Sequence, residues 1–168
     1  VDVLGADHGG YVPRLEAALE ALGHSRDDLH VVLIQMVNLT RGGEAVKMSK
    51  RAGTVVSLRE VVEEVGRDAA RFTFLTRRHD SPLEFDLAVA TRQTSDNPVY
   101  YVQYAHARIA SVLRQAAEAG VVVDPAPPLA ALGDPEVELL RVLATWPDVV
   151  DVAARELEPH RIAFWVLE

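Results

Sequence analysis

Two lysines stand close together in a chain that otherwise uses arginine for its positive charge. Fifteen of the 17 basic residues are Arg, and the only lysines, Lys47 and Lys50, lie in Lys47-Met48-Ser49-Lys50-Arg51. Guanidinium does not replace the compact, mobile ammonium group geometrically. Two ammonium groups, one guanidinium and the Ser49 hydroxyl can together meet a polyphosphate. We therefore treat this segment as a candidate anion site.

The surroundings of the two lysines also favour a phosphate-binding loop. Gly42, Gly43 and Gly53 flank them, and glycine permits close approach of the backbone to a ligand. Arg41–Arg59 carries five basic residues and one acidic residue, or +4, whereas the whole chain has a net charge of 17 − 25 = −8. A solvated basic loop is the alternative that charge alone leaves open. The Walker A pattern GxxxxGKS/T is absent.

A second candidate site is Gly5-Ala6-Asp7-His8-Gly9-Gly10, predicted as a loop that joins a strand at 1–4 to a helix. Ligands bind at such places in open α/β sheets. Asp7 can accept hydrogen bonds from ribose hydroxyls, and His8 can bond to a nucleotide or substrate. The alternative is a tight turn in which Asp7 caps the helix. A zinc site is not predicted, because Asp7 and His8 lack a third ligand at a suitable spacing.

A β-α-β arrangement is expected to position both candidate sites. The helix should begin near Pro13 and end at Gly23, because apolar residues recur at helical spacing between them. Val31–Leu39 is apolar except for Gln35, which predicts one strand buried on both faces, as in a parallel sheet. The polar loop 40–54 then carries the lysines.

The signals after the lysines are mostly helical. Ser57 and Glu60 form a capping box that opens a helix through Val65, and Asp68 can cap the next one. Leu83–Leu87 is either a short strand or the entry to a helix near 87–94. The remaining signals are Asn97 and Pro98 at the start of a long helix that ends near Gly120, a proline-rich linker at 124–128, and helices beginning near Pro135, Asp148 and Pro159.

The fold class that follows is α/β in the first part and all-α afterwards, with a boundary near residue 95. Tyr100, Tyr101, Tyr104 and Arg108 at the start of the long helix can stack on RNA bases, although packing within a helical bundle is the commoner explanation. Trp146 and Trp165 are predicted to be bundle core.

Composition excludes several classes of protein. The chain has no Cys, which removes disulfides, cysteine-ligated metals and cysteine nucleophiles, and fits a reducing compartment. Its longest apolar runs are much shorter than the roughly 18 residues that span a bilayer. No signal peptide is recognisable. We therefore expect a cytoplasmic protein with no membrane partner.

The string KMSK at 47–50 resembles the KMSKS loop of class I aminoacyl-tRNA synthetases, with Arg51 in place of the last Ser. GADHGGYVPR at 5–14 looks like the segment of arginyl-tRNA synthetases that shapes the adenylate and amino-acid pocket. NPVYYVQYAHARI at 97–109 is very similar to the opening of their helical anticodon-binding domain. The resemblance extends over essentially the whole chain.

This resemblance implies roles for individual residues. Lys50 is the main cation that stabilises the leaving pyrophosphate, Lys47 supports it, and Ser49 is a phosphate donor. Gly5 lies against the nucleotide, and Asp7 and His8 face it. The backbone near Met36 or Val37 meets the adenine edge, unless Gln35 is simply satisfied by neighbouring backbone. The implied ligands and partners are ATP with its Mg²⁺, arginine and tRNA(Arg).

The resemblance also implies an organisation of the chain. Residues 1–95 would be the C-terminal half of a class I Rossmann-type catalytic domain, and 96–168 the first helices of the anticodon-binding bundle. The HIGH motif of the family is absent, so we expect an internal fragment of a monomeric arginine–tRNA ligase. The fragment alone should be inactive, and its exposed apolar faces could cause it to self-associate.

Three other readings remain open at this point. One is a non-catalytic, synthetase-derived RNA-binding module. Another is a different class I aminoacyl-tRNA synthetase. The third is an unrelated nucleotide-binding α/β domain with a helical appendage.

Overall fold

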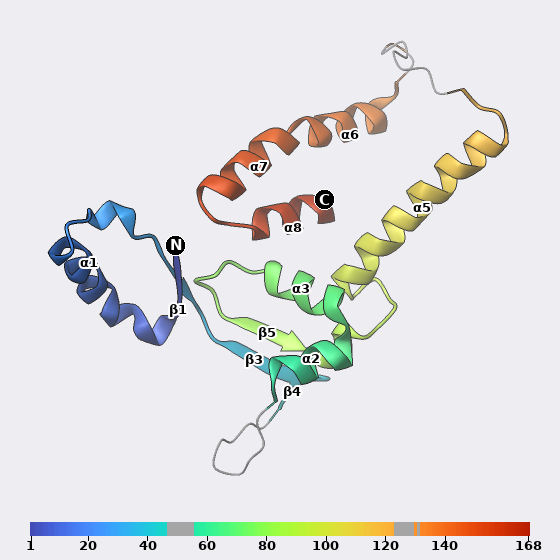
Figure 1. The fold of residues 1–168 in the computed structure, drawn as a ribbon. Helices are drawn as coiled ribbons and strands as arrows, with labels where there is room; N and C mark the ends of the chain where they lie inside the picture. Colours follow the sequence, from blue (N-terminus) through green and yellow to red (C-terminus); the bar gives the residue numbers. More distant parts are fainter. Residues whose placement is uncertain (47–55, 123–129, 131) are drawn as a thin grey trace. The chain divides into compact units, whose positions relative to one another are not determined.

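The computed structural model describes residues 1–46, 56–122, 130 and 132–168 (Figure 1). The chain divides into two compact units, Val1–Thr91 and Arg92–Glu168. In the described part, every strand belongs to the first unit and the second unit contains helices. The lysine segment and the predicted linker at 124–128 lie outside the described residues. The functional assignment of 1–95 and 96–168 to two domains stays a prediction.

The first elements form the predicted β-α-β arrangement. Strands β1 (Asp2–Gly5) and β2 (Val31–Ile34) are parallel, and helix α1 (Val12–Ala21) lies between them in the chain. The 3-10 helix η1 (Ala6–Tyr11) occupies the stretch that was predicted as an open loop, and a shorter one, η2 (Arg26–Asp28), precedes β2. Gly23 follows α1 with φ of +88°, a conformation that favours glycine after a helix end.

The prediction of a single strand over Val31–Leu39 is wrong. The chain leaves β2 at Ile34 and enters β3 (Val37–Arg41). Strand β3 belongs to a second sheet, where it lies between β4 (Glu44–Ala45) and β5 (Leu83–Asp86). The cause is a distant stretch, 79–83, whose backbone forms hydrogen bonds with the two residues between the strands. The N–H of Gln35 donates to the carbonyl of His79 at 2.7 Å, and the N–H of Leu83 donates to the carbonyl of Met36 at 3.2 Å.

The second sheet also changes the polar loop predicted for 40–54. Strand β3 pairs in parallel with β5 (Leu83–Asp86) and antiparallel with β4 (Glu44–Ala45). Residues 40–45 therefore form a β-hairpin, with Gly42 and Gly43 in its turn at φ of +62° and +85°. Both alternatives predicted for 83–87 are found one after the other: strand β5 ends at Asp86, and a helix begins at Leu87.

The core of the first unit surrounds β5, not the strand that was predicted to be buried. Residues of β2 and β3 are half-buried or exposed, whereas Phe85 has no exposed surface. Helices α2 (Leu58–Val65) and α3 (Arg67–Leu75) cover this sheet (Figure 1). Phe74 of α3 meets Phe85 edge to face, with ring centroids 5.4 Å apart. The buried cluster consists of Val61, Leu83, Phe85, Leu87 and Ala90.

Helix starts in the first unit follow local rules with one exception. Ser57 Oγ accepts from the N–H of Glu60 at 3.2 Å and Glu60 Oε2 accepts from the N–H of Ser57 at 2.6 Å, which confirms the capping box. Asp68 is not a cap, because Gly66 alone separates α2 from α3 and is itself the N-cap. Helix α4 (Leu87–Ala90) is much shorter than the helix predicted near 87–94.

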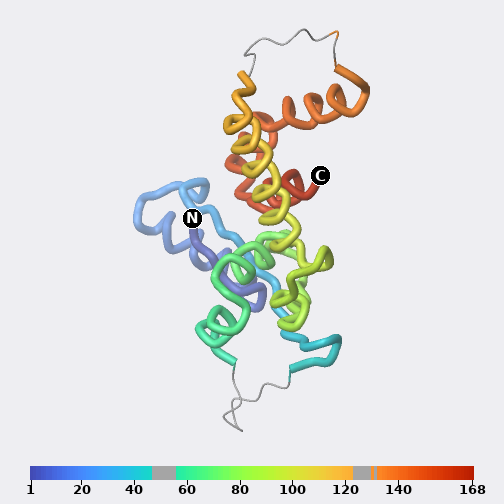
Figure 2. Tube along the Cα trace, turned by 90° about the vertical axis from the view of Figure 1, so that its right-hand side faces the viewer, coloured from blue at the N-terminus to red at the C-terminus, as the bar shows by residue number. Residues whose placement is uncertain are grey.

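The second unit consists of helices near the positions that the sequence predicts. Asn97 caps α5 (Pro98–Glu118) by accepting from the N–H of Val99 at 3.1 Å. The described helices after α5 are α6 (Asp134–Ala144), α7 (Trp146–Arg155) and α8 (His160–Leu167). Helices α7 and α8 lie side by side (Figures 1 and 2).

The two tryptophans contact each other but are not core residues. Their ring centroids are 4.6 Å apart, yet Trp146 is 38% exposed. The indole N–H of Trp165 donates to Thr145 Oγ1 at 3.0 Å. Because this polar contact lies at the junction of α6 and α7, the pair packs along that junction instead of inside the bundle.

Replacing Phe85 by Ala should destabilise the first unit strongly. The substitution removes a side chain with no exposed surface, so we expect a loss of about 3–5 kcal/mol in the free energy of unfolding. Leu58→Ala is the matched control, because Leu58 is 64% exposed and should change stability by less than about 0.5 kcal/mol. Urea unfolding of the 168-residue chain measures both. Equal losses would contradict the position assigned to the core.

Candidate functional site

The ends of the lysine segment are fixed to a single core. Lys47, Ser49 and Lys50 lie outside the described residues, but Val46 and Val56 on either side pack against the cluster around β5. The N–H of Val46 also donates to the carbonyl of Leu39 at 2.9 Å. The chain therefore leaves and re-enters the same packed structure.

An ion pair connects the two sides of this segment. Both guanidinium nitrogens Nη1 and Nη2 of Arg41, at the end of β3, donate to the carboxylate of Glu64 in α2, and the Nη2 bond is 2.9 Å long. These hydrogen bonds hold the pKa of the Glu64 carboxyl below its ordinary value. Both side chains are substantially exposed, so the pair orients β3 and α2 more than it stabilises the fold.

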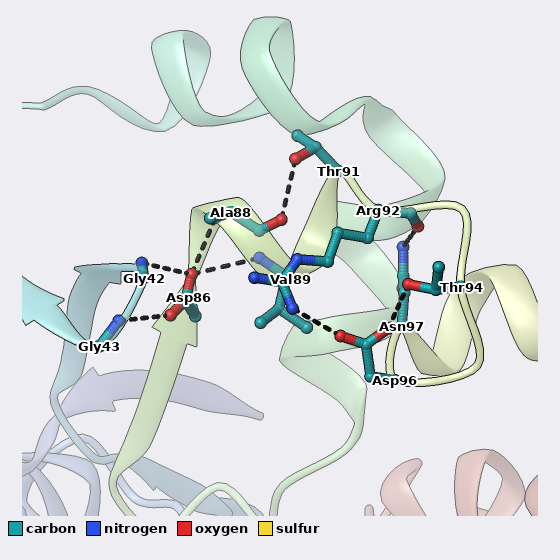
Figure 3. Close-up of polar contacts among 10 residues, drawn as sticks. All are labelled: Gly42, Gly43, Asp86, Ala88, Val89, Thr91, Arg92, Thr94, Asp96 and Asn97. Carbon is teal, nitrogen blue, oxygen red and sulfur yellow. Dashed lines mark hydrogen bonds and ion pairs between the residues drawn. The ribbon is translucent and has the colours of Figure 1, made fainter.

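Asp86 holds the hairpin turn against α4 (Figure 3). Its Oδ1 accepts from the N–H of Gly42 at 3.1 Å, and its Oδ2 accepts from the N–H of Gly43 at 2.9 Å. The same Oδ1 caps α4, accepting from Ala88 at 2.8 Å and Val89 at 3.2 Å. These N–H donors, that of Gly42 foremost, hold the pKa of the Asp86 carboxyl below its ordinary value.

Sequence reasoning missed this role of Asp86. An acidic residue immediately before a helix is a recognisable N-cap signal, and it would have identified the contact with α4. Nothing local indicates the contact with the hairpin, because Gly42 and Gly43 lie 44 and 43 residues away in the chain.

The second candidate site lies at the carboxyl edge of the β1–β2 sheet. Gly5 ends β1 opposite Ile34 of β2, so Gly5–His8 and Gln35–Met36 both follow directly from that edge. The sequence predicts that both stretches contact a ligand, and the structure brings them to the same end of one sheet.

Asp7 and His8 project from η1 as exposed side chains. Asp7 is 78% and His8 54% exposed, and Asp7 Oδ2 lies 3.8 Å from His8 Nε2. The alternative in which Asp7 caps the helix is not found, because the N-cap of α1 is Tyr11 and has no side-chain bond. A Cβ at Gly5 would come within 2.5 Å of Asp7 Oδ1, so glycine at this position allows the Asp7 carboxylate to lie against the strand end.

The backbone of Met36 is already partly engaged. Its carbonyl accepts from the N–H of Leu83, whereas its N–H donates to the side-chain Oε1 of Gln35 at 3.3 Å. Gln35 therefore finds a hydrogen-bond partner in neighbouring backbone, which is one of the two alternatives that the sequence predicts. The long bond to the N–H of Met36 is one that a ligand acceptor could replace. The Met36 side chain is 69% exposed.

The described residues contain neither a candidate metal site nor a helix that could span a membrane. Among them, no group of three or more His, Asp or Glu side chains is arranged to hold a metal ion. Of the helices in the same part of the chain, none has the length and apolar character needed to cross a membrane.

The aromatic face of α5 is exposed in the second unit. Tyr100 and Tyr104 stack with centroids 6.1 Å apart, and Tyr101 and Tyr104 are each about half exposed. The guanidinium of Arg108 lies 5.7 Å from the Tyr104 ring centroid and donates to its hydroxyl at 3.1 Å. The face therefore presents stacked rings and a cation together.

A family model described as the DALR anticodon binding domain matches residues 102–168. The match covers most of the helical second unit, beginning within α5.

The whole chain is also similar to named proteins. It is 66% identical to an arginine–tRNA ligase of Anaeromyxobacter dehalogenans strain 2CP-C and 67% identical to that of Anaeromyxobacter strain Fw109-5, with all of this chain aligned in both cases. It spans 29% and 28% of the length of these relatives.

Two solved structures share the fold of this chain over nearly its whole length. A Thermus thermophilus arginyl-tRNA synthetase superposes with a TM-score of 0.75 at 25% identity, covering 98% of this chain and 30% of that one. A Campylobacter jejuni protein proposed to be an arginyl-tRNA synthetase gives a TM-score of 0.84 at 38% identity, covering 98% and 36%.

Replacing Asp86 by Asn should make the first unit less sensitive to acid. Because the folded-state pKa of Asp86 is lowered, its carboxylate stabilises the fold above the unfolded-state pKa, and this contribution is lost as pH falls through the lower folded-state value. We expect the unfolding free energy of Asp86→Asn to decline less between about pH 5 and pH 2 than that of the unmodified chain. Urea unfolding at a series of pH values tests this, with Glu84→Gln on the exposed side of β5 as the control. Identical pH profiles for the unmodified chain and Asp86→Asn would contradict it.

Proposed function

We propose, because this chain is homologous over its whole length to arginine–tRNA ligases, that it forms part of an enzyme that joins arginine to tRNA(Arg). In this reaction the arginine carboxylate attacks the α-phosphorus of ATP and displaces pyrophosphate, and the arginyl group then passes from AMP to the 3′ end of the tRNA. The observation that carries the proposal is the 66–67% identity to ligases over all of this chain.

Each unit has a proposed part in this enzyme. The first is proposed as the C-terminal half of a class I Rossmann-type catalytic domain, and its parallel β1-α1-β2 unit supports this. The second is proposed as the first helices of the anticodon-binding bundle, which the DALR match over 102–168 supports. The stacked tyrosines and Arg108 of α5 are suited to contact RNA, since bases stack on aromatic rings and guanidinium groups.

The nucleotide is proposed to bind at the carboxyl edge of the β1–β2 sheet. Gly5 allows close approach, and the exposed Asp7 carboxylate and His8 ring supply polar contacts. The N–H of Met36 would donate to the adenine edge in exchange for its 3.3 Å bond to Gln35. Mg²⁺ would arrive bound to the phosphates of ATP, as this ion usually keeps substrate phosphates and waters among its ligands.

The lysine segment supplies the chemistry in this proposal. Lys50 would stabilise the charge that develops on the departing pyrophosphate, Lys47 would support it, and Ser49 would donate to a phosphate oxygen. Fixed cations contribute to catalysis when they meet charge that is greater in the transition state than in the bound substrate. The packing of Val46 and Val56 on one core provides fixed ends for such a segment.

Lys50→Ala tests the proposed chemistry in a hybrid ligase, in which this chain replaces its counterpart in the A. dehalogenans enzyme. We expect arginine-dependent ATP–pyrophosphate exchange to fall about 100- to 1,000-fold, because a transition-state contact is lost. Binding of tRNA should be unchanged. Arg59→Ala, which removes an exposed cation from α2, is the control for general charge effects.

The outcomes separate the proposed function from its rivals. A hybrid ligase without arginine-dependent exchange would favour a non-catalytic RNA-binding module. Activation of another amino acid would favour a different class I synthetase. Normal exchange by Lys50→Ala would show that the role assigned to Lys50 is wrong.

Asp7→Asn tests the proposed nucleotide site in the same hybrid ligase. The amide retains the size of the side chain but loses the charged acceptor for ribose hydroxyls. We expect KM for ATP to rise about tenfold or more, with a smaller change in kcat. Steady-state exchange kinetics at varied ATP measure this. Asp27→Asn in η2 is the control, and an equal effect of both substitutions would argue against a nucleotide contact by Asp7.

A further inference from the structure

We propose that Asp86 is a positioning residue for catalysis, because its carboxylate fixes the hairpin that leads into the lysine segment. The proposal rests on the proposed function, since it concerns the placement of Lys47 and Lys50. It assigns Asp86 no contact with substrate. It requires the carboxylate to connect two pieces of backbone that are distant in the chain, and Figure 3 shows this connection.

The two carboxylate oxygens of Asp86 accept hydrogen bonds from different backbone groups. Oδ1 accepts from three N–H groups, those of Gly42, Ala88 and Val89. Oδ2 accepts from the N–H of Gly43 at 2.9 Å. A helix cap requires a single oxygen, and Ser, Thr or Asn would supply it as well. The second oxygen is therefore the part of this side chain that capping does not explain.

The turn that Asp86 holds has a backbone suited to a carboxylate. Gly42 and Gly43 both have positive φ, and their consecutive N–H groups point to the two oxygens of one side chain. Consecutive backbone N–H groups in such turns form small anion-binding concavities. Here the anion belongs to the protein itself, so the turn is tied to β5 and α4.

This contact acts together with the packing of Val46 to fix where the lysine segment begins. The chain passes from the turn through β4 to Val46, which packs on the buried cluster and is the last described residue before the segment. Asp86 is adjacent to Phe85 and Leu87, the largest fully buried side chains among the described residues. The carboxylate is thereby anchored to the buried cluster, and its two bonds to Gly42 and Gly43 hold the turn against that cluster.

The far end of the segment is held independently. Val56 packs on the same cluster, and the Arg41–Glu64 pair connects the end of β3 to α2. Loss of the Asp86 contact would therefore leave the far end of the segment in place and free only the hairpin turn to shift, between the Arg41–Glu64 pair and Val46 on the cluster. Displacement of a catalytic group by about 1 Å can lower a rate about 100-fold, so a shift of the hairpin that is passed on to the lysine segment would lower kcat.

The test uses Asp86→Asn and Asp86→Ser in the hybrid ligase. Both side chains retain an oxygen that can cap α4, whereas Asn places an NH₂ donor opposite the N–H of Gly43 and Ser is too short to reach the turn. We expect kcat for ATP–pyrophosphate exchange to fall about 10- to 100-fold in both. KM for arginine should change little, and the melting temperature at neutral pH should fall only modestly, by the contribution of the carboxylate to the fold. Glu84→Gln, on the exposed side of β5, should leave exchange unchanged.

A double substitution distinguishes positioning from a general structural effect. If Asp86 acts through Lys50, then Asp86→Asn should cause little further loss in a Lys50→Ala background, because coupled groups are not additive. Independent multiplication of the two losses would overturn the proposal. Amide hydrogen exchange in the 168-residue chain gives a second readout: Asp86→Asn should reduce protection of the N–H of Gly43 and leave that of Ala88 protected.

The failure of this inference is distinguishable from failure of the proposed function. Loss of exchange with Lys50→Ala but normal kcat with Asp86→Asn and Asp86→Ser would overturn the positioning role alone. Normal exchange with Lys50→Ala would overturn the role of the lysine and the inference with it. A large fall in melting temperature that accompanies the loss of kcat in Asp86→Asn would show that the residue only stabilises the fold.

Discussion

The burial of one side of β5 is the constraint on which the first unit depends. Leu83 and Phe85 alternate with the exposed Glu84, and Leu87 continues the apolar surface into α4. Burial of side chains of this size contributes about 1.5–3 kcal/mol each. The same cluster receives Val46 and Val56, the described residues on either side of the lysine segment. A short strand far along the chain thus fixes both ends of the segment that carries the proposed chemistry.

Local signals predicted much of this fold, and long-range ones did not. The Ser57–Glu60 capping box and the Asn97 cap are satisfied within three residues of sequence, so their types and spacing suffice to identify them. The break between β2 and β3 depends instead on backbone groups near His79, whose Nδ1–H also donates to the carbonyl of Leu33 at 2.9 Å. A continuous apolar run records that a stretch is extended, but not where its pairing partner changes.

The same distinction applies to the candidate sites. Gly5, Asp7 and His8 could be predicted because the carboxyl end of a strand that precedes a helix is a general ligand position, and the exposure of Asp7 and His8 agrees with it. The lysines could be predicted from their rarity and from the resemblance of KMSK. The contact of Asp86 with the hairpin could not be predicted, since it joins residues that are 43 and 44 positions apart in the chain.

The distribution of charge limits how the second unit can bind the proposed tRNA. Residues 121–168 carry nine acidic residues and three Arg, whereas residues 92–120 carry two acidic residues and three Arg. Phosphate contacts depend on basic groups, so the acidic helices α6–α8 are poorly suited to supply them. The cations of this unit are better placed on α5, where Arg108 lies against the exposed ring of Tyr104. A net charge of −8 is therefore compatible with RNA binding only where cations and aromatic rings are gathered locally, and α5 is where the described part of this unit gathers them.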